Sequence, residues 1–280
     1  MRRAFAPHGF NNNHEQGNMN APIQARLAIM ASAIAIAMAG AANAQTSEPQ
    51  QGAPAATVGF NAALTTDYRY RGISQTRLKP ALQGGADYVH GDGWYVGAWG
   101  STIKWIEDAG GDGEIEIDVY GGKRGEFSPG LAPGLSYDVG MLRYFYPGNK
   151  LGQVAGFANA HTTEVYAQLG YGPAYIKYSH ATTNLFAFVD SDNSGYLDIG
   201  ANLDAGNGVT LQLHVGHQRV ENNPASDYTY WKLGVSRQFQ VATVALAYIG
   251  TNAGKSAYAS PANGKFTGRD ALQLTLSRTF

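Results

Sequence analysis

The 280-residue chain has no cysteine, little charge and, after residue 44, no long hydrophobic run. The lack of cysteine excludes disulfide bonds, thiolate catalysis and cysteine-ligated metals. Charged residues make up 15% of the chain, whereas soluble domains typically contain about a quarter. The formal net charge of −1 gives no electrostatic basis for binding nucleic acid. A membrane-spanning helix needs about 20 apolar residues, and no run after residue 44 reaches that length.

Glycine (36 residues) and tyrosine (17 residues) are abundant instead, and apolar and polar residues alternate from residue 58 onward. Phe60, Leu64 and Tyr68 share one parity, while Asn61 and Asp67 share the other. A period of two is the pattern of a β-strand with two different faces. About twelve segments of this kind, each near the ~10 residues of a tilted membrane-spanning strand, are expected at 58–71, 81–89, 94–101, 114–124, 135–146, 163–171, 174–181, 195–203, 209–218, 228–238, 241–250 and 269–280.

The connections between these segments alternate between long and short. The exception is 125–134, which is long although its place in the alternation calls for a short connection. An outer-membrane barrel has an even number of strands, short periplasmic turns and longer external loops. We therefore predict an all-β fold, a transmembrane up-and-down antiparallel β-barrel of about 12 strands, over residues 58–280. A soluble β-sandwich is the alternative, but its outward polar face would carry more lysine and glutamate.

The first 44 residues have the features of a signal peptide. An uncharged run at 27–42 follows several arginines, and an A-x-A pattern ends at Ala44, before Gln45. The run is short for a spanning helix, and the small-residue box predicts cleavage between Ala44 and Gln45. An uncleaved anchor is the alternative. We expect an exported protein in the bacterial outer membrane.

Two features near this segment affect the length of the mature chain. Translation could begin at Met1 or at Met19, and the second start gives a more ordinary amino-terminal region. Residues 45–57 are rich in proline, glycine and glutamine, so we expect a disordered periplasmic lead before the barrel.

The last segment ends on an aromatic residue, as outer-membrane barrels typically do. Four residues of one parity are predicted to form the signal for the outer-membrane assembly machinery: Leu272, Leu274, Leu276 and Phe280. Arg278 departs from this pattern because an aromatic or apolar residue is usual two places before the end.

The charges in strand middles fall on the face opposite the apolar one and are predicted to line the lumen. Arg69 and Arg71 would form a positive stripe on the first strand, and the acids at 114, 116 and 118 a negative one on the fourth. The small excess of acids favours weak cation preference. The alternative is that these charges neutralise one another and plug the barrel. The predicted lumen-lining charges are Asp67, Arg69, Arg71, Asp87, Glu114, Glu116, Asp118, Arg124, Glu164, Lys177, Asp198 and Lys232.

Candidate sites for chemistry are weak in this sequence. The stretch 190–195 (DSDNSG) begins like a calcium-binding EF-hand loop, but its twelfth position is Ala201 instead of glutamate. A polar external loop at 190–198 is therefore expected. The histidines are scattered, and no G-x-S-x-G nucleophile turn is present. We expect no enzyme, no metal site and no cofactor.

Several stretches resemble one known family. The stretch 61–76 (NAALTTDYRYRGISQT), followed by 79–88 (KPALQGGADY) and 93–101 (GWYVGAWGS), is similar to the start of the TorF family, a group of proteobacterial proteins classed as porins mainly by inference. The similarity continues through 137–148 (YDVGMLRYFYPG) and 245–252 (ALAYIGTN). It covers nearly all of 58–280 and implies location and architecture more firmly than transport. It brings no catalytic residues.

The expected function is passive passage of small solutes, with weak cation preference, through a barrel embedded in outer-membrane lipid. A non-conducting structural or interaction barrel with a lumen filled by side chains is the alternative. An outer-membrane enzyme fits less well because the sequence has no catalytic constellation.

Overall fold

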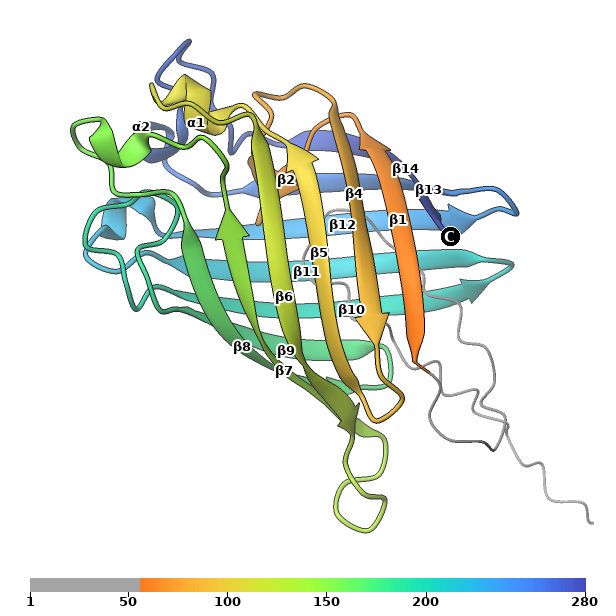
Figure 1. Cartoon of the computed structure of the whole chain (residues 1–280). Coiled ribbons are helices and arrows are strands. Elements are labelled where there is room, and N and C mark those ends of the chain that lie inside the picture. Colours follow the sequence, from red (N-terminus) through yellow and green to blue (C-terminus); the bar gives the residue numbers. More distant parts are fainter. Residues whose placement is uncertain (1–55) are drawn as a thin grey trace, which may run out of the picture. The chain divides into compact units, whose positions relative to one another are not determined.

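The structure is a computed structural model that describes residues 56–280. The predicted signal peptide, including Ala44 and Gln45, and most of the predicted lead lie outside the described residues. The described chain forms one closed barrel of antiparallel strands (Figure 1), which confirms the predicted fold class. Its twelve strands are β1 (Thr57–Thr65), β4 (Ala81–Val89), β5 (Trp94–Thr102), β6 (Ile115–Glu126), β7 (Leu135–Phe145), β8 (Thr162–Tyr171), β9 (Ala174–Ala181), β10 (Gly195–Gly206), β11 (Val209–Arg219), β12 (Tyr228–Gln238), β13 (Thr243–Thr251) and β14 (Ala271–Thr279).

Each barrel strand pairs with the barrel strands before and after it along the chain. β1 closes the barrel by pairing with β14 in the register Thr65↔Thr275. Phe60 and Phe280 extend this seam with a hydrogen bond from the Phe280 amide to the Phe60 carbonyl (2.8 Å). The first and last strands therefore leave no free edge along this pairing, as a membrane barrel requires.

Alternation along the strands separates a lipid face from an interior face. In β12, Trp231, Leu233 and Val235 are exposed, whereas Tyr230 and Ser236 are buried. Leucine, valine and isoleucine side chains are exposed in the same way on every barrel strand. In water such a surface would be unfavourable, but in a bilayer it is the outward apolar band of a transmembrane barrel.

The connections differ in length between the two ends of the barrel. The long ones (66–80, 103–114, 146–161, 182–194, 220–227 and 252–270) share one end with the one-turn helices α1 (Trp105–Asp108) and α2 (Lys255–Tyr258) (Figure 1). The other end has the connections 90–93, 127–134, 172–173, 207–208 and 239–242. Within residues 56–280, no helix has the length and apolar character to cross a membrane.

The clearest departure from the sequence prediction is the first strand, which was expected to run to residue 71. Strand β1 ends at Thr65, and residue 65 pairs with Ala81 of β4. The chain therefore leaves the wall and returns to it at the same point. Residues 66–80, called the plug below, contain a separate two-stranded sheet, β2 (Arg69–Tyr70) and β3 (Ile73–Ser74).

Candidate functional site

The plug is a small hairpin with its own internal hydrogen bonds. Arg69 Nε donates to Asp67 Oδ2 (2.8 Å), and Ser74 Oγ donates to Asp67 Oδ1 (2.5 Å). Thr76 Oγ1 also donates to Asp67 Oδ1 (3.2 Å). Because the Asp67 carboxylate binds groups from both arms of the hairpin, the chain turns inward after residue 65 instead of continuing the strand. The Asp67 carbonyl is in turn held to the wall by Gln273 Nε2 (2.6 Å).

The tip of the hairpin is a two-residue turn made by Arg71 and Gly72, which both have positive φ (45° and 84°). Such a turn matches the strand twist but favours Asn-Gly, because few residues with a Cβ adopt left-handed φ easily. A Cβ on Gly72 would lie 2.8 Å from Cβ of Tyr230 and 2.7 Å from Cγ2 of Thr251. The tip therefore touches strands β12 and β13 of the wall.

Tyr68 attaches the plug to a second part of the wall. Its fully buried side chain donates a 2.6 Å hydrogen bond to Oε1 of Glu116 on β6. Its ring packs edge-on against Trp99 of β5, with centroids 5.5 Å apart. Both the polar end and the apolar body of this tyrosine are therefore satisfied by the wall.

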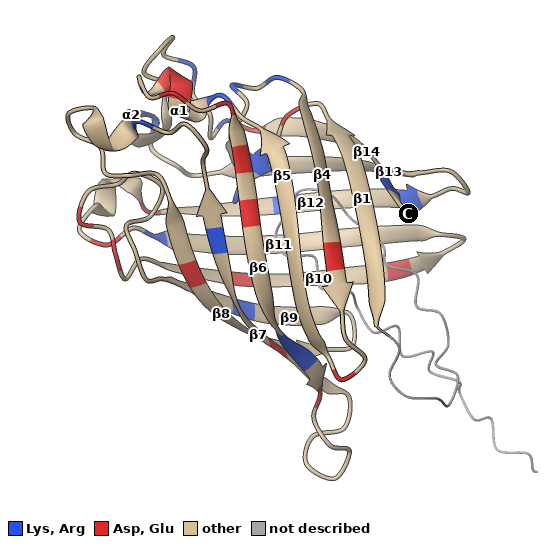
Figure 2. Cartoon of the chain, viewed as in Figure 1, with Lys and Arg blue, Asp and Glu red and all other residues tan. Residues whose placement is uncertain are grey.

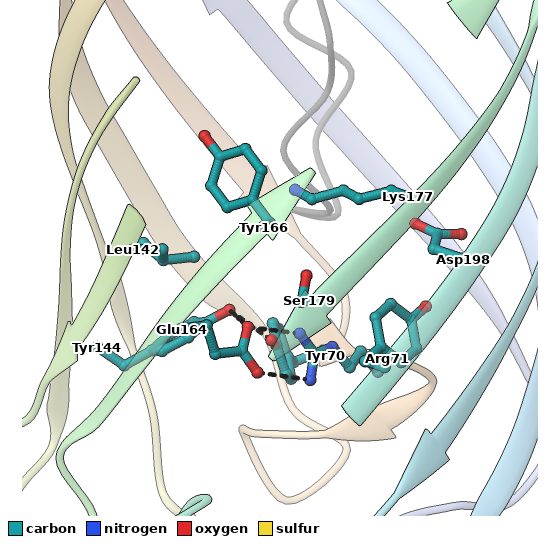
Figure 3. Close-up of a pocket in the computed structure, with 10 residues that line it drawn as sticks. Tyr70, Arg71, Leu142, Tyr144, Glu164, Tyr166, Lys177, Ser179 and Asp198 are labelled. Atoms are coloured by element: carbon teal, nitrogen blue, oxygen red, sulfur yellow. Dashed lines mark hydrogen bonds and ion pairs between the residues drawn. The ribbon is translucent and has the colours of Figure 1, made fainter. Parts of the chain in front are cut away.

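Arg71 attaches the plug to a third part of the wall. Its guanidinium binds Glu164 with two parallel hydrogen bonds, Nη2 to Oε2 (2.7 Å) and Nη1 to Oε1 (3.0 Å), and Nη1 also donates to Gln218 Oε1 (2.6 Å). The guanidinium carbon lies 3.9 Å from the centroid of the Tyr196 ring. Figure 3 shows the dashed contacts between Arg71 and Glu164, with Tyr70 and Tyr144 nearby. Charge-assisted bidentate pairs are among the strongest polar contacts in proteins.

The space left beside Arg71 is very small. The cavity lined by Tyr70, Glu164 and Lys177 has a volume of about 10 Å³, roughly the room for one water molecule. Tyr70 of the plug and Tyr144, Tyr166 and Tyr196 of the wall line this small space.

The predicted lumen charges fall into three groups. Asp67, Arg69 and Arg71 belong to the plug. Glu114 lies before β6, with its side chain 67% exposed and in contact with Lys104 Nζ. The other eight occupy the interior face of the wall, where Figure 2 shows acidic bands on β6: Asp87, Glu116, Asp118, Arg124, Glu164, Lys177, Asp198 and Lys232.

Two of these expectations were wrong. Arg69 and Arg71 form no stripe on the first strand, because that strand ends at Thr65. Glu114 is not part of an acidic row facing the lumen, because β6 begins at Ile115 and the loop residue Lys104 binds its carboxylate outside the barrel. Only Glu116 and Asp118 of that row face inward.

Sequence reasoning missed one buried acid of the barrel wall, Asp138, as well as Asp108 of α1, and it missed the role of the tyrosines. Asp138 is buried and accepts a 2.6 Å hydrogen bond from Tyr95, which also binds the hydroxyl of Tyr166. Asp138 has the same parity as Tyr144 in β7, and this was the available signal. Lys177 Nζ lies 3.9 Å from the centroid of the Tyr166 ring, so tyrosines solvate the interior cations as well as filling space.

The predicted assembly residues lie on the lipid side of β14. Leu272, Leu274, Leu276 and Phe280 are all exposed there. Arg278, which departs from the usual apolar pattern of a terminal strand, places its guanidinium 5.0 Å from the centroid of the Phe280 ring. These positions fit a lipid-facing terminal strand, while the assembly role itself stays a prediction.

The loop 182–194 shows no metal-binding arrangement. Ser191 is buried there, accepts the Leu185 amide (2.7 Å) and donates to the Phe188 carbonyl (2.8 Å). Across residues 56–280 no three His, Asp or Glu side chains are grouped so that they could hold a metal ion.

The chain was compared with curated proteins, with solved structures and with protein families. No curated protein matches the chain. Among solved structures, a KdgM porin in complex with disordered oligogalacturonate is similar over 81% of this chain and 98% of its own, at 5% identity and a TM-score of 0.46. A NanC porin covers 80% and 98%, at 10% identity and a TM-score of 0.47. OprD of Pseudomonas aeruginosa covers 80% and 66%, at 10% identity and a TM-score of 0.37.

The family comparison covers most of the chain. The model of a family described as bacterial proteins of unknown function (Gcw_chp) matches residues 49–280. The TorF resemblance is not tested by this match and stays a prediction. The chain belongs to the Gcw_chp family.

Proposed function

We propose that this protein is a porin-type barrel of the bacterial outer membrane that passes small solutes and ions through a bore kept nearly closed by the plug. The observation that carries this proposal is the path of residues 66–80. They leave the wall at Thr65, extend into the lumen as far as Glu164 on β8 and return at Ala81. A bore obstructed by one tethered loop opens by movement of that loop alone, without any change in the wall.

The outward apolar band and the long loops at one end support a membrane location. Export through a signal peptide cleaved before Gln45 belongs to the same proposal, as does recognition of the last strand by the assembly machinery. The membrane-fraction protein should therefore begin at Gln45 by mass spectrometry, and a protein retaining residues 19–44 would contradict this maturation.

We propose weak cation preference for the open bore. Among the charged residues of the interior, Glu114 is left out and Asp138 is added, so the acids still outnumber the bases by two. The interior acids are Asp67, Asp87, Glu116, Asp118, Asp138, Glu164 and Asp198, and the bases are Arg69, Arg71, Arg124, Lys177 and Lys232. Rings and rows of one charge sign bias the ions that a pore admits.

A second candidate is a non-conducting structural barrel, favoured by the cavity of about 10 Å³ beside Arg71. Conductance of refolded protein in a planar bilayer separates the two functions. We expect small conductance from the wild type, and larger, more cation-selective conductance from the Arg69→Ala, Arg71→Ala double variant, since both arginines tie the plug down. Lys104→Ala, in an external loop, is the control and should change neither property. If the wild type and the double variant are both silent, the structural function holds.

A further inference from the structure

The wall amide that binds Arg71, Gln218, is oriented by the wall itself. Gln218 Nε2 donates to the carbonyl oxygens of Gly195 (3.1 Å) and Arg219 (3.0 Å), which leaves its Oε1 facing the lumen. The Gln218 amide oxygen therefore points into the bore for reasons that do not involve the plug, and such preorganisation favours ligand binding. Tyr144 contributes its hydroxyl to Glu164 Oε2 (3.3 Å). The Tyr144 hydroxyl beside Glu164 also binds the hydroxyl of Tyr70 in the plug (2.5 Å).

The shape of this group matches one kind of cation. Glu164 presents two oxygens to two nitrogens of a planar fork, and Tyr196 offers its ring face 3.9 Å from the guanidinium carbon. An ammonium has no planar fork and would lose the bidentate geometry. We name Glu164, Gln218 and Tyr196 the cage.

The cage contacts only the outer end of the Arg71 guanidinium. Both Nη atoms have partners, whereas Nε has no hydrogen-bond partner among residues 56–280. Recognition therefore ends at the two terminal nitrogens and the ring face. An alkylguanidinium whose chain extends into the bore would make the same contacts as the arginine side chain.

Arg71 is an unusual residue for the turn that presents it. Its φ of 45° is left-handed, a region that disfavours residues other than glycine, asparagine and aspartate. Backbone strain of this kind at a turn persists where the side chain is held by its surroundings. Here the hairpin has an arginine at the position where asparagine would be preferred before glycine. The contacts of Arg71 with the cage compensate for the backbone strain.

We propose that the cage is a binding site for alkylguanidinium solutes and that Arg71 occupies it as a built-in ligand, so that such a solute competes with the plug for the same groups. This inference deepens the proposed function by naming a solute class, and it rests on that function insofar as the solute reaches the cage through the bore. The cage itself is testable without any flux.

The experiment empties the cage while keeping the turn. Arg71→Gly removes the side chain, and Gly-Gly is well suited to a two-residue turn with positive φ at both positions. Methylguanidinium at about 10 mM should raise the thermal unfolding midpoint of the purified variant by about 2–4 °C, as a ligand of millimolar affinity would. Methylammonium at the same concentration should give no shift. The wild type, with its cage occupied, should respond to neither.

A second substitution tests the site of binding. In the Arg71→Gly, Glu164→Gln double variant the methylguanidinium shift should disappear, because the bidentate acceptor is gone. Arg124→Ala is the matched control, since the Arg124 guanidinium is an interior charge that lies over the Tyr95 ring and not at the cage. It should show no shift with either probe.

Three results would overturn the proposal: equal shifts with both probes, a shift that survives Glu164→Gln, or an equal shift in the wild type. If Arg71→Gly does not fold, Arg71→Asn gives the preferred Asn-Gly turn. If both fail, the readout is the refolding yield, which methylguanidinium and not methylammonium should restore. A positive thermal shift with no conductance in any variant would reject the proposed transport while the cage stands.

Discussion

The hydroxyl of Tyr68 and the Glu116 carboxylate form a 2.6 Å hydrogen bond that joins the plug to strand β6 across 48 residues of sequence. The Arg71–Glu164 pair forms the corresponding contact with β8. The plug is thus tied to the wall at separate points, by an aromatic hydroxyl on one side and by a guanidinium on the other.

Tyr68→Phe should destabilise the barrel by about 1–3 kcal/mol, because a buried carboxylate oxygen loses its donor while the ring packing on Trp99 is kept. The measurement is the free energy of unfolding in urea, from reversible folding into lipid vesicles. Tyr248→Phe is the matched control, since that hydroxyl donates to Asp270 at the same distance (2.6 Å) but is exposed. Equal losses in the two variants would show that burial of the Glu116 bond adds nothing.

Gly72→Ala should unseat the plug without removing any charge. The added methyl group would overlap Tyr230 and Thr251, and the residue would be held at a φ of 84°. We expect higher conductance than in the wild type, measured in planar bilayers. Gly148→Ala has a similar φ (74°) but nothing within 4 Å of the added atom, so it controls for backbone strain alone. A rise in conductance in both variants would reject the contact with Tyr230 and Thr251 as the cause.

Strand β11 allows a direct test of which face meets lipid. Leu213→Arg puts a charge on the exposed face near the middle of the strand and should cost about 2–4 kcal/mol. Gln212→Arg, one residue away at nearly the same depth, points to the polar interior and should cost much less. Urea unfolding in lipid vesicles measures both. The reverse order of effects would mean that the faces are exchanged.

The last residue combines a side-chain role with a backbone role. Phe280→Ser keeps the hydrogen bonds between residues 280 and 60 (2.8 and 3.3 Å), whereas deletion of Phe280 removes them. If the aromatic ring is the assembly signal, both variants should give less heat-modifiable folded barrel in the outer membrane. A defect only in the deletion variant would assign the effect to barrel closure.

Most of the wall could be predicted from the sequence because alternation is a local pattern. Strands β4, β9 and β12 have the predicted bounds, because successive residues in them face lipid and lumen in turn. The turn at Asn207 and Gly208 was assigned to a longer connection, although Asn-Gly is the preferred pair for a two-residue turn.

The plug could not be predicted in the same way. The alternation of β1 continues through residues 68–71, because these residues enter a second, shorter hairpin. A local pattern cannot distinguish one long strand from two successive strands whose apolar residues fall at the same even-numbered positions. The distinguishing features are distant contacts. Arg71 binds Glu164 and Gln218, which lie 93 and 147 residues away in the sequence.

Because residue 65 pairs directly with Ala81, the obstruction is an insertion between two strands that already form a hairpin without it. Replacing residues 66–80 with an Asn-Gly turn like the one at 207–208 would remove the plug and leave the barrel intact. The same geometry constrains how the molecule diverges. A new plug sequence must be accompanied by changes on the strands that contact it, including β6, β8, β11 and β12, whereas the adjoining strands β1 and β4 accept any segment whose ends meet.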